Sequence, residues 1–412
     1  MTIVDGACRS CGARPLQPVV DLGAMPLANA LIKRECLDEP EERFPLHLTF
    51  CERCSLAQIT ESVPPEKLFG DYLYFSSFSD TMLRHCEAIA ERVVRERRLS
   101  ATSLVMEVAS NDGYLLQFYR RAGVRVLGVE PAANIARVAE NERKIPTLCA
   151  FFGSEIAAQL ARDGMRADVL HANNVIAHVA DLNGFVRGIA TVLKEDGVAI
   201  IETPSVRDMV ERLEFDTIYH EHLHYFSLAS LDSLFARHGL SIVDVEHVSI
   251  HGGSLRIFVT PSTAGRPPSP AFRTMLQAEV DAGTTGPNFY RDFGARIEAL
   301  KHKLTALIAE LKAAGKSIAA YGASAKGSTL LNAFGIGAES LDFVVDRSSY
   351  KQGLYTPGTH LPIFAPTKLL DAKPDYLLLL TWNLESEILA QQEEYRRRGG
   401  RFIVPVPDVR IV

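Results

Sequence analysis

The sequence predicts an α/β protein built from a small N-terminal lobe and two Rossmann-like α/β domains. A chain of 412 residues is longer than one hydrophobic core usually serves. Strand and helix patterns alternate in two separate stretches, and the short apolar strands are typical of a parallel sheet covered on both faces. The N-terminal stretch is instead rich in Pro and Cys. We therefore expect domains at 1–72, 73–245 and 246–412.

The N-terminal lobe contains two pairs of cysteines, Cys8 with Cys11 and Cys51 with Cys54, each with a two-residue spacer. This spacing lets both thiolates of a pair bind one ion, and two pairs make a closed tetrahedral zinc site. Four thiolates leave no open coordination position, so we expect a structural zinc ion. A redox pair is the alternative, but neither motif follows a strand of a βαβ unit as a thioredoxin-like motif would.

The central domain begins with a predicted amphipathic helix at 80–99. Predicted strands then lie at 103–110, 124–130, 168–174 and 197–204, and predicted helices at 114–123, 133–141 and 182–193. Two β-rich segments, 240–250 and 253–261, end this region. The strands are apolar without alternation, which indicates burial on both faces.

The C-terminal domain follows a Pro-rich segment at 263–271, which we interpret as a linker or exposed loop. A long helical pattern covers about 289–314. The predicted strands of the second α/β unit lie at 316–324, 341–346, 375–382 and 401–407.

A turn at 107–113 joins the first central strand to its helix, and Glu130 ends the second strand. A ligand of a doubly wound sheet lies at the carboxyl ends of the strands, and a carboxylate such as Glu130 can accept both hydroxyls of a ribose. A dinucleotide needs the full glycine-rich turn, of which only Gly113 remains. Asn111 and Asp112 disfavour a phosphate but suit S-adenosylmethionine (SAM), which has none, so SAM is favoured over NAD.

The predicted strand at 168–174 ends in Asn173 and Asn174, which either contact the cofactor or cap the next helix. The predicted SAM-binding residues are Ala109, Asn111, Gly113, Glu130, Pro131 and Asn173.

Three histidines and a glutamate alternate with aromatic residues between Tyr219 and Phe226. No metal-binding helical spacing is present, and alternate residues of a strand or loop face opposite ways. A general base is the functional interpretation, because a neighbouring carboxylate can orient an imidazole and stabilise its charged form. A set of partly exposed polar loop residues is the alternative. His178 could reach the same pocket, although a lone histidine is more often a satisfied helix residue.

In the C-terminal unit, the segment 321–329 follows a strand and opens a helix. Its backbone N–H groups and Lys326 could bind a diphosphate, and a tight strand-to-helix turn is the alternative. Asp346 and Lys351 are candidate nucleotide contacts.

Composition argues against several classes of protein. The net charge of −6 and the lack of a clustered basic patch disfavour nucleic acid, and the basic runs at 92–98 and 396–401 fit solvated faces. No stretch approaches a membrane helix, and the N-terminus lacks the features of a signal peptide. We therefore expect a cytoplasmic protein.

Taken together, the motifs resemble those of the sugar 3-C-methyltransferases that act on nucleotide-linked 4-keto-deoxysugars in antibiotic deoxysugar pathways. The resemblance covers essentially the whole chain. It rests on the paired cysteines, on EVASNDG, ANNVIAHV and YHEHLHYFS in the central domain, and on HGGSLR, GASAKG and KQG…PGT in the C-terminal domain. One departure is Ala109, where methyltransferases commonly have Gly.

The resemblance implies a class I methyltransferase domain that uses SAM, a structural zinc ion, and a thymidine-diphosphate (dTDP)-linked keto sugar as substrate. The C4 ketone acidifies the C3 proton, a base removes it, and the enolate carbon takes the methyl group. By resemblance His222 is the base, Glu221 supports it, and Tyr219 and His178 line the site or stabilise the oxyanion.

The resemblance also implies an aromatic segment over the cofactor at 71–77, without deciding whether Tyr72 or Tyr74 faces inward. The predicted substrate-binding residues are Ser254, Arg256, Ser324, Lys326, Asp346 and Lys351. The alternatives are another nucleotide sugar or carbon acid as methyl acceptor, or a NAD-dependent or nucleotide-sugar-binding protein. We expect a monomer or a weak homodimer.

Overall fold

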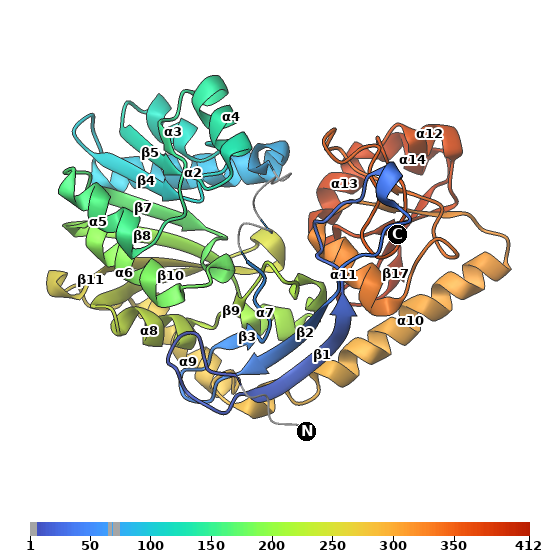
Figure 1. The fold of residues 1–412 in the computed structure, drawn as a ribbon, viewed down its shortest axis with the longest axis horizontal. Coiled ribbons are helices and arrows are strands. Elements are labelled where there is room, and N and C mark those ends of the chain that lie inside the picture. The colour runs from blue at the N-terminus through green and yellow to red at the C-terminus, as the bar shows by residue number, and fades with distance from the viewer. Residues whose placement is uncertain (1–5, 65–67, 69–74) are drawn as a thin grey trace.

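The structure is a computed structural model that describes residues 6–64, 68 and 75–412. In these residues the strands form three sheets (Figure 1). We call the part before residue 65, together with strand β9 (His224–Tyr225), the N-terminal lobe. The seven-stranded sheet with its helices is the central unit, and the six-stranded sheet with its helices is the C-terminal unit. None of the helices in the described part of the chain combines the length and the apolar character needed to cross a membrane.

The N-terminal lobe is an antiparallel sheet with the order β1-β2-β3-β9. Its strands are β1 (Gln17–Met25), β2 (Phe44–Phe50), β3 (Ala57–Ile59) and β9 (His224–Tyr225). The fourth strand therefore comes from the central stretch of the sequence, where Tyr225 pairs with Ala57 and His224 with Gln58. The lobe is completed by the last residues of the histidine-rich cluster.

The central unit has the sheet order β10-β11-β8-β7-β4-β5-β6. Its strands are β4 (Leu104–Val108), β5 (Arg125–Val129), β6 (Thr147–Leu148), β7 (Ala167–Asn173), β8 (Leu193–Pro204), β10 (Leu240–Val248) and β11 (Ser254–Pro261). Its helices are α2 (Asp80–Arg97), α3 (Leu116–Arg121), α4 (Ala133–Arg143), α5 (Ser154–Arg162), α6 (Leu182–Val192), α7 (Val206–Glu211) and α8 (Leu228–Ala236). Strands β4 to β8 are parallel, whereas β10 and β11 are antiparallel additions at one edge.

The expected boundary between residues 245 and 246 falls inside this sheet. Strand β11 lies beyond residue 245, yet it pairs with β8 on one side and β10 on the other. Chain order changes direction at β4, with β5 on one side and β7 on the other, so the carboxyl ends of these strands form the crevice in which ligands of open α/β sheets bind.

The C-terminal unit has the sheet order β14-β13-β12-β15-β16-β17. Its strands are β12 (Ile318–Tyr321), β13 (Val344–Val345), β14 (Ile363–Phe364), β15 (Tyr376–Leu379), β16 (Arg401–Val404) and the antiparallel β17 (Arg410–Ile411). Its helices are α11 (Ala325–Phe334), α12 (Lys368–Ala372), α13 (Glu385–Gln391) and α14 (Glu393–Arg397). Helices α9 (Pro270–Asp281) and α10 (Phe293–Ala313) connect the two units. The expected helix at 289–314 thus starts four residues later, after a 3₁₀ turn at Pro287–Tyr290.

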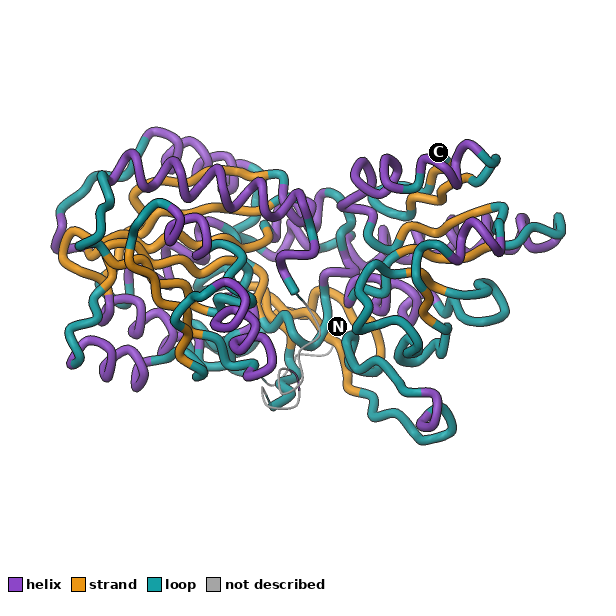
Figure 2. Tube along the Cα trace, turned by 90° about the horizontal axis from the view of Figure 1, so that it is seen from above, coloured by secondary structure: helices purple, strands orange, loops and turns teal. Residues whose placement is uncertain are grey.

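The two α/β units lie on either side of the molecule, and β1 and β2 cross between them at its base (Figures 1 and 2). The segment 26–43 between β1 and β2, which we call the strap, runs onto the C-terminal unit. Ile32 and Tyr355 exchange backbone hydrogen bonds of 2.9 and 2.8 Å, and Glu41 accepts one from the backbone of Gly358 at 2.9 Å. The N-terminal lobe therefore contacts both units.

Candidate functional site

One cavity of about 730 Å³ lies between the central and C-terminal units. This volume is within the range of sites for small molecules and cofactors. Its wall contains thirteen of the predicted site residues: Ala109, Asn111, Glu130, Pro131, Asn173, His178, Tyr219, Glu221, His222, Ser324, Lys326, Asp346 and Lys351. Carboxyl ends of both parallel sheets thus open onto the same space.

The turn after β4 brings its backbone close to Glu130. Ala109 and Asn111 have positive φ angles of 53° and 48°, and the Asn111 N–H donates to Glu130 Oε2 at 2.9 Å. The Ala132 N–H donates to Glu130 Oε1 at the same distance. Burial raises the pKa of the Glu130 carboxyl to about 7, and both backbone hydrogen bonds oppose this effect. The carboxylate is therefore fixed in place beneath the turn.

Gly113 does not line the cavity. Its φ is 78°, and a Cβ at this position would lie 2.9 Å from Cγ1 of Ile145. The glycine therefore serves the turn and its packing on the core, rather than contact with a ligand, because only glycine adopts this conformation without steric cost.

Polar side-chain atoms around the turn point to a polar ligand. The Oδ1 atoms of Asn173 and Asn174 are buried at the cavity wall without a hydrogen-bond partner among the described residues. Buried acceptors of this kind normally have a partner, so a ligand donor fits here. Glu107, which belongs to the predicted turn, lies in β4, fully buried and outside the cavity wall, and burial raises its pKa well above its usual value.

His222 and Tyr219 form a hydrogen-bonded pair in the cavity wall. His222 Nδ1 lies 2.8 Å from the backbone oxygen of Thr217, and Nε2 lies 2.8 Å from the Tyr219 hydroxyl. A carbonyl oxygen only accepts, so Nδ1 carries the proton and the Nε2 lone pair accepts a hydrogen bond from the Tyr219 hydroxyl. The rings of His178 and His222 meet edge to face, with centroids 4.7 Å apart. Burial lowers the pKa of His178 to about 4, so this imidazole stays neutral.

Glu221 also lines the cavity, but its hydrogen-bond partner differs from those of His222. It is 3% exposed, and its Oε1 accepts a hydrogen bond from Asn29 Nδ2 at 2.7 Å. Burial raises its pKa to about 7, opposed by Asn29 and by the charge of Lys351. The hydrogen bonds that orient the His222 imidazole come from Thr217 and Tyr219, so Glu221 is not its orienting partner.

The other two histidines of the cluster lie outside the cavity wall. His220 Nε2 lies 3.1 Å from the backbone oxygen of Pro45, in the N-terminal lobe. His224 is 1% exposed in β9, and burial lowers its pKa to about 3. The backbone turns at this point, with the His222 N–H donating to the Tyr219 oxygen at 2.8 Å, and β9 begins only at His224. This path places His222 in the cavity wall and the other two histidines outside it.

The C-terminal wall repeats the arrangement around Glu130. Asp346 follows β13, and its Oδ2 accepts the Ala323 N–H from the turn after β12 at 2.8 Å. Its Oδ1 accepts the Ser348 N–H, also at 2.8 Å. Each α/β unit thus has a carboxylate just after its second strand. This carboxylate accepts one backbone N–H from the turn after the first strand, and one from the residue two positions after the carboxylate itself.

Lys326 supplies a buried cation near the start of α11. Its Nζ has no hydrogen-bond partner in the described parts of the chain and lies 4.4 Å from the centroid of the Trp382 ring. Ser324 caps this helix by accepting the Gly327 N–H at 3.1 Å, and Lys351 Nζ donates to the Ala323 oxygen at 2.7 Å. A helix N-terminus and an unpartnered ammonium group favour an anion at this wall.

A pair of buried carboxyl groups lies behind Lys326. Asp216 accepts a hydrogen bond from Trp382 Nε1 at 2.7 Å, and burial raises the pKa of Glu214 to about 7, opposed by the charge of Lys326. Gly252 has a φ of 96°, and a Cβ there would overlap the Glu214 carboxylate. Gly252 of the HGG motif thus allows its loop to pack onto the Glu214 carboxylate.

Two predicted substrate-binding residues, Ser254 and Arg256, are not in the cavity wall. The Ser254 hydroxyl donates to the backbone of its own loop, at Ile250, over 3.1 Å. Arg256 Nε lies 2.7 Å from Glu202, and its Nη1 lies 2.9 Å from Glu246. Both residues lie on β11, an edge addition to the central sheet, and the guanidinium group is neutralised there. The structure therefore corrects their assignment to substrate binding.

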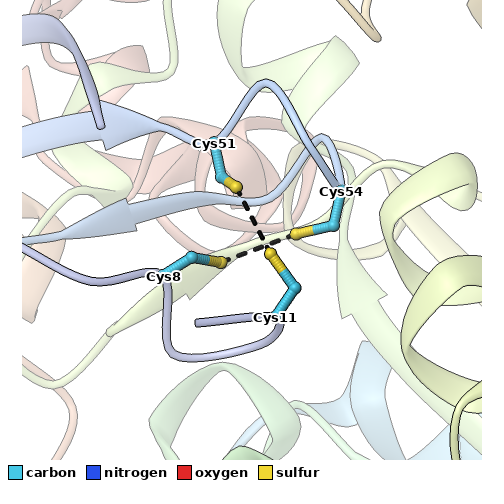
Figure 3. Close-up of side chains that lie close together, drawn as sticks. All are labelled: Cys8, Cys11, Cys51 and Cys54. Carbon is cyan, nitrogen blue, oxygen red and sulfur yellow. Dashed lines mark hydrogen bonds between the residues drawn. The ribbon is translucent and has the colours of Figure 1, made fainter. Parts of the chain in front are cut away.

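The four paired cysteines gather in one cluster between the turns of the N-terminal lobe (Figure 3). Their sulfur atoms all lie within 4.8 Å of one another, and the shortest separations are 3.5 Å for Cys8–Cys54 and 3.6 Å for Cys11–Cys51. A tetrahedral zinc site with bonds of about 2.3 Å has sulfurs about 3.8 Å apart. The cluster therefore fits one zinc ion.

Tyr72 and Tyr74 lie outside the described residues. The chain resumes at Phe75, which lines the cavity and stacks on Tyr350 of the C-terminal unit with ring centroids 4.8 Å apart.

Comparison with known families matches nearly the whole chain. Residues 8–69 match a putative zinc binding domain, residues 82–245 a methyltransferase domain, and residues 249–407 a C-methyltransferase C-terminal domain. The chain is 38% identical over 405 residues to the C-methyltransferase NovU of Streptomyces niveus, covering 98% of this chain and 96% of NovU.

More distant similarities involve only part of the chain. An ubiquinone biosynthesis O-methyltransferase of Bartonella quintana is 30% identical over 99 residues, which cover 24% of this chain and 40% of that protein. Among solved structures, magnesium protoporphyrin IX methyltransferase (ChlM) from Synechocystis PCC 6803 with bound SAH aligns with a TM-score of 0.35 and 14% identity, over 47% of this chain and 90% of that chain.

Proposed function

Because the chain belongs to the C-methyltransferase family that includes NovU, we propose that it methylates C3 of a dTDP-linked 4-keto-deoxysugar. The protein is a SAM-dependent C-methyltransferase with a zinc-binding domain. The observation that carries the proposal is that both α/β units line one cavity. This cavity combines a SAM-type turn and a histidine–tyrosine pair on one wall with a buried lysine and a helix N-terminus on the other.

The central wall fits SAM. Glu130 would accept the ribose hydroxyls, and the unpartnered Oδ1 atoms of Asn173 and Asn174 would accept donors of the methionine part. Acidic and amide groups disfavour phosphate but suit a cationic ligand. When bound, SAM supplies a methyl group on a positively charged sulfur, which a nucleophilic carbon can accept.

The histidine–tyrosine pair suits removal of an acidic C–H proton. His222 Nε2 has the lone pair, because the Thr217 carbonyl keeps the proton on Nδ1. We assign the C3 proton of the sugar to Nε2, and the electrons of the C–H bond pass to the enolate. The Tyr219 hydroxyl, which points at Nε2 in the free protein, would donate to the C4 oxygen as this atom gains negative charge.

Glu221 would stabilise the protonated imidazole through its charge. It borders the same cavity and is held by a hydrogen bond to Asn29. Methyl transfer would break the bond between the methyl group and sulfur, so release of S-adenosylhomocysteine and return of the proton from His222 to solvent would complete the cycle.

The C-terminal wall suits the nucleotide half of the substrate. Lys326 and the N-terminus of α11 would bind the diphosphate, Asp346 would accept a hydroxyl of the nucleoside sugar, and Lys351 would lie between the diphosphate and Glu221. The four thiolates would bind zinc as a structural ion, since they leave no open position for a substrate. Location in the cytoplasm, where such thiols stay reduced, remains a prediction.

The direct test is mass-spectrometric detection of a methylated product. The purified protein is incubated with SAM and a panel of nucleotide-linked 4-keto and 4-hydroxy sugars, with dTDP and UDP forms of each. We expect an added methyl group only on a dTDP-linked 4-keto sugar. Methylation of a 4-hydroxy sugar, or of no sugar in the panel, would refute the proposed acceptor.

The base assignment is tested with His222→Asn, which should abolish product formation and exchange of the C3 proton with deuterated solvent. Binding of S-adenosylhomocysteine should stay within about twofold of wild type. His302→Asn is the matched control, because His302 is exposed on α10 and does not line the cavity. Proton exchange at the wild-type rate in the His222 variant would assign the base elsewhere.

A further inference from the structure

Asn29 is the N-terminal lobe's contribution to the cavity wall. It lies in the strap, 192 positions before Glu221, and its Nδ2 donates to Glu221 Oε1 at 2.7 Å. An uncharged amide that reaches a buried carboxyl at this distance forms a charge-assisted hydrogen bond when the carboxyl is ionised. The contact links the lobe directly to the histidine-rich cluster.

The strap fixes the position of Asn29 from both sides. A turn closes around it, with the Ala30 N–H donating to the Leu27 oxygen at 3.1 Å and the Leu31 N–H to Asn29's own oxygen at 2.9 Å. Immediately afterwards, Ile32 pairs with Tyr355 of the C-terminal unit. A side chain on such a doubly held turn has little freedom to leave its partner.

Glu221 has few other groups that favour its charge. Lys351 approaches from the C-terminal unit and opposes the effect of burial less strongly than Asn29 does. His178 lies beside the Glu221 backbone and is neutral, and His222 and Tyr219, on the same segment, are hydrogen bonded to each other. Among these neighbours, the Asn29 amide is the group that contacts the Glu221 carboxyl itself.

We propose that Asn29 is a positioning residue for the methyl-transfer reaction, which keeps Glu221 ionised and directed into the cavity while His222 becomes protonated. The inference rests on the proposed function and adds to it a role for the N-terminal lobe. The lobe thus takes part in the acid–base chemistry through one amide, in addition to its zinc site.

The first experiment needs no substrate. The carboxyl carbons of glutamate are labelled with ¹³C, and the Glu221 signal is assigned by its absence in Glu221→Gln. In Asn29→Ala the ionised carboxylate loses its amide donor, so the pKa of Glu221 should rise by about one to two units. Asn29→Asp should raise it further, because two carboxyls at hydrogen-bond distance resist joint ionisation. An unchanged titration in Asn29→Ala would overturn the proposal.

The second experiment measures kcat/KM against pH with the nucleotide sugar. Ionised Glu221 is the form needed, so the acid limb of the profile should move to higher pH in Asn29→Ala by the shift seen in the titration. In Glu221→Gln turnover should fall and the acid limb should disappear. Adding Asn29→Ala should change neither, because the amide then has no carboxylate to stabilise. A shift that persists in the Glu221→Gln background would overturn the role assigned to Glu221.

Glu41→Ala is the matched control. It removes the strap's contacts with Gly358 and His360 but leaves the Asn29 amide in place. We expect its pH profile to match wild type, and a shift equal to that of Asn29→Ala would show that a loosened strap, not the amide, is responsible. If the wild type methylates no sugar, the proposed function fails, while the titration of Glu221 still decides whether Asn29 sets its ionisation.

Discussion

At the scale of single residues, Ala109 has a backbone conformation that its side chain disfavours. Its φ of 53° lies in the left-handed region, which costs a residue with a Cβ about 1–2 kcal/mol. Glycine has no such cost but loses more chain entropy on folding, by about 0.5–1 kcal/mol. The turn therefore explains both why glycine suits this position and why alanine is tolerated.

Ala109→Gly should stabilise the protein by about 0.5–1 kcal/mol, which corresponds to a rise of about 2 °C in the unfolding midpoint of a domain of this size. Calorimetry of the ligand-free protein measures this change. Ala132→Gly is the control, because Ala132 lines the same cavity with an ordinary φ of −77° and should lose stability on substitution. If the unfolding midpoint fell equally in both variants, the positive φ of Ala109 would not be the cause of the change.

At the scale of elements, the HGG loop owes its path to a glycine that packs against a carboxylate. Gly252→Ala would place a methyl group inside the Glu214 carboxylate at a φ of 96°. We expect a loss of about 2–4 kcal/mol in stability, from overpacking together with the backbone cost. Gly265→Ala separates the two causes. Its φ is 61° but a Cβ meets nothing within 4 Å, so only the backbone cost of about 1 kcal/mol should appear in urea unfolding.

The two turns that contain the paired cysteines are a second element whose contribution to stability and turnover can be measured. Arg9, between two of the cysteines, donates to the backbone of Ile59 at 2.5 Å, and Ile59 ends the strand that pairs with β9. Cys51→Ser should therefore lose bound zinc and lower the thermal midpoint. It should also reduce turnover, since β9 directly follows the His222 segment.

Elemental analysis together with thermal unfolding checks this prediction. Cys149→Ser is the matched control, because Cys149 is exposed and lies outside the cysteine cluster. It should retain one zinc ion per chain and the wild-type midpoint. Stoichiometric zinc in Cys51→Ser would contradict the four-thiolate site.

At the scale of the whole molecule, the two units place their ligand groups on opposite walls of one cavity. Lys326→Met should raise the dissociation constant of the nucleotide sugar about 10- to 100-fold, the effect of losing one charged contact, and leave that of S-adenosylhomocysteine unchanged. Isothermal titration with each ligand measures both. Lys303→Met is the control, because Lys303 is an exposed residue of α10 that pairs with Asp408. Equal weakening of both ligands would contradict the separation of the two walls.

The sequence predicted the parts of the molecule that depend on local pattern. Apolar runs predict the buried strands, and the cysteine spacing predicts the cysteine cluster. Both can be recognised because each pattern lies within a few residues of sequence. Contacts between distant segments leave no such signal. Asn29 approaches Glu221 through the strap. Arg256 meets Glu202 because β11 pairs with β8, and no local pattern specifies this pairing. For the same reason the sequence does not indicate that the Arg256 guanidinium is already paired and not available to a substrate.

Strand β9 has a consequence for biosynthesis. The N-terminal lobe leaves the ribosome first, yet β3 remains an unpaired edge until His224 and Tyr225 have been translated, and the strap waits longer still for Tyr355. Exposed edges of this kind invite pairing with other chains. A truncated message that ends before residue 224 should therefore yield an aggregation-prone fragment. The N-terminal lobe is synthesised before the two α/β units, but its sheet is completed only after most of the central unit has been translated.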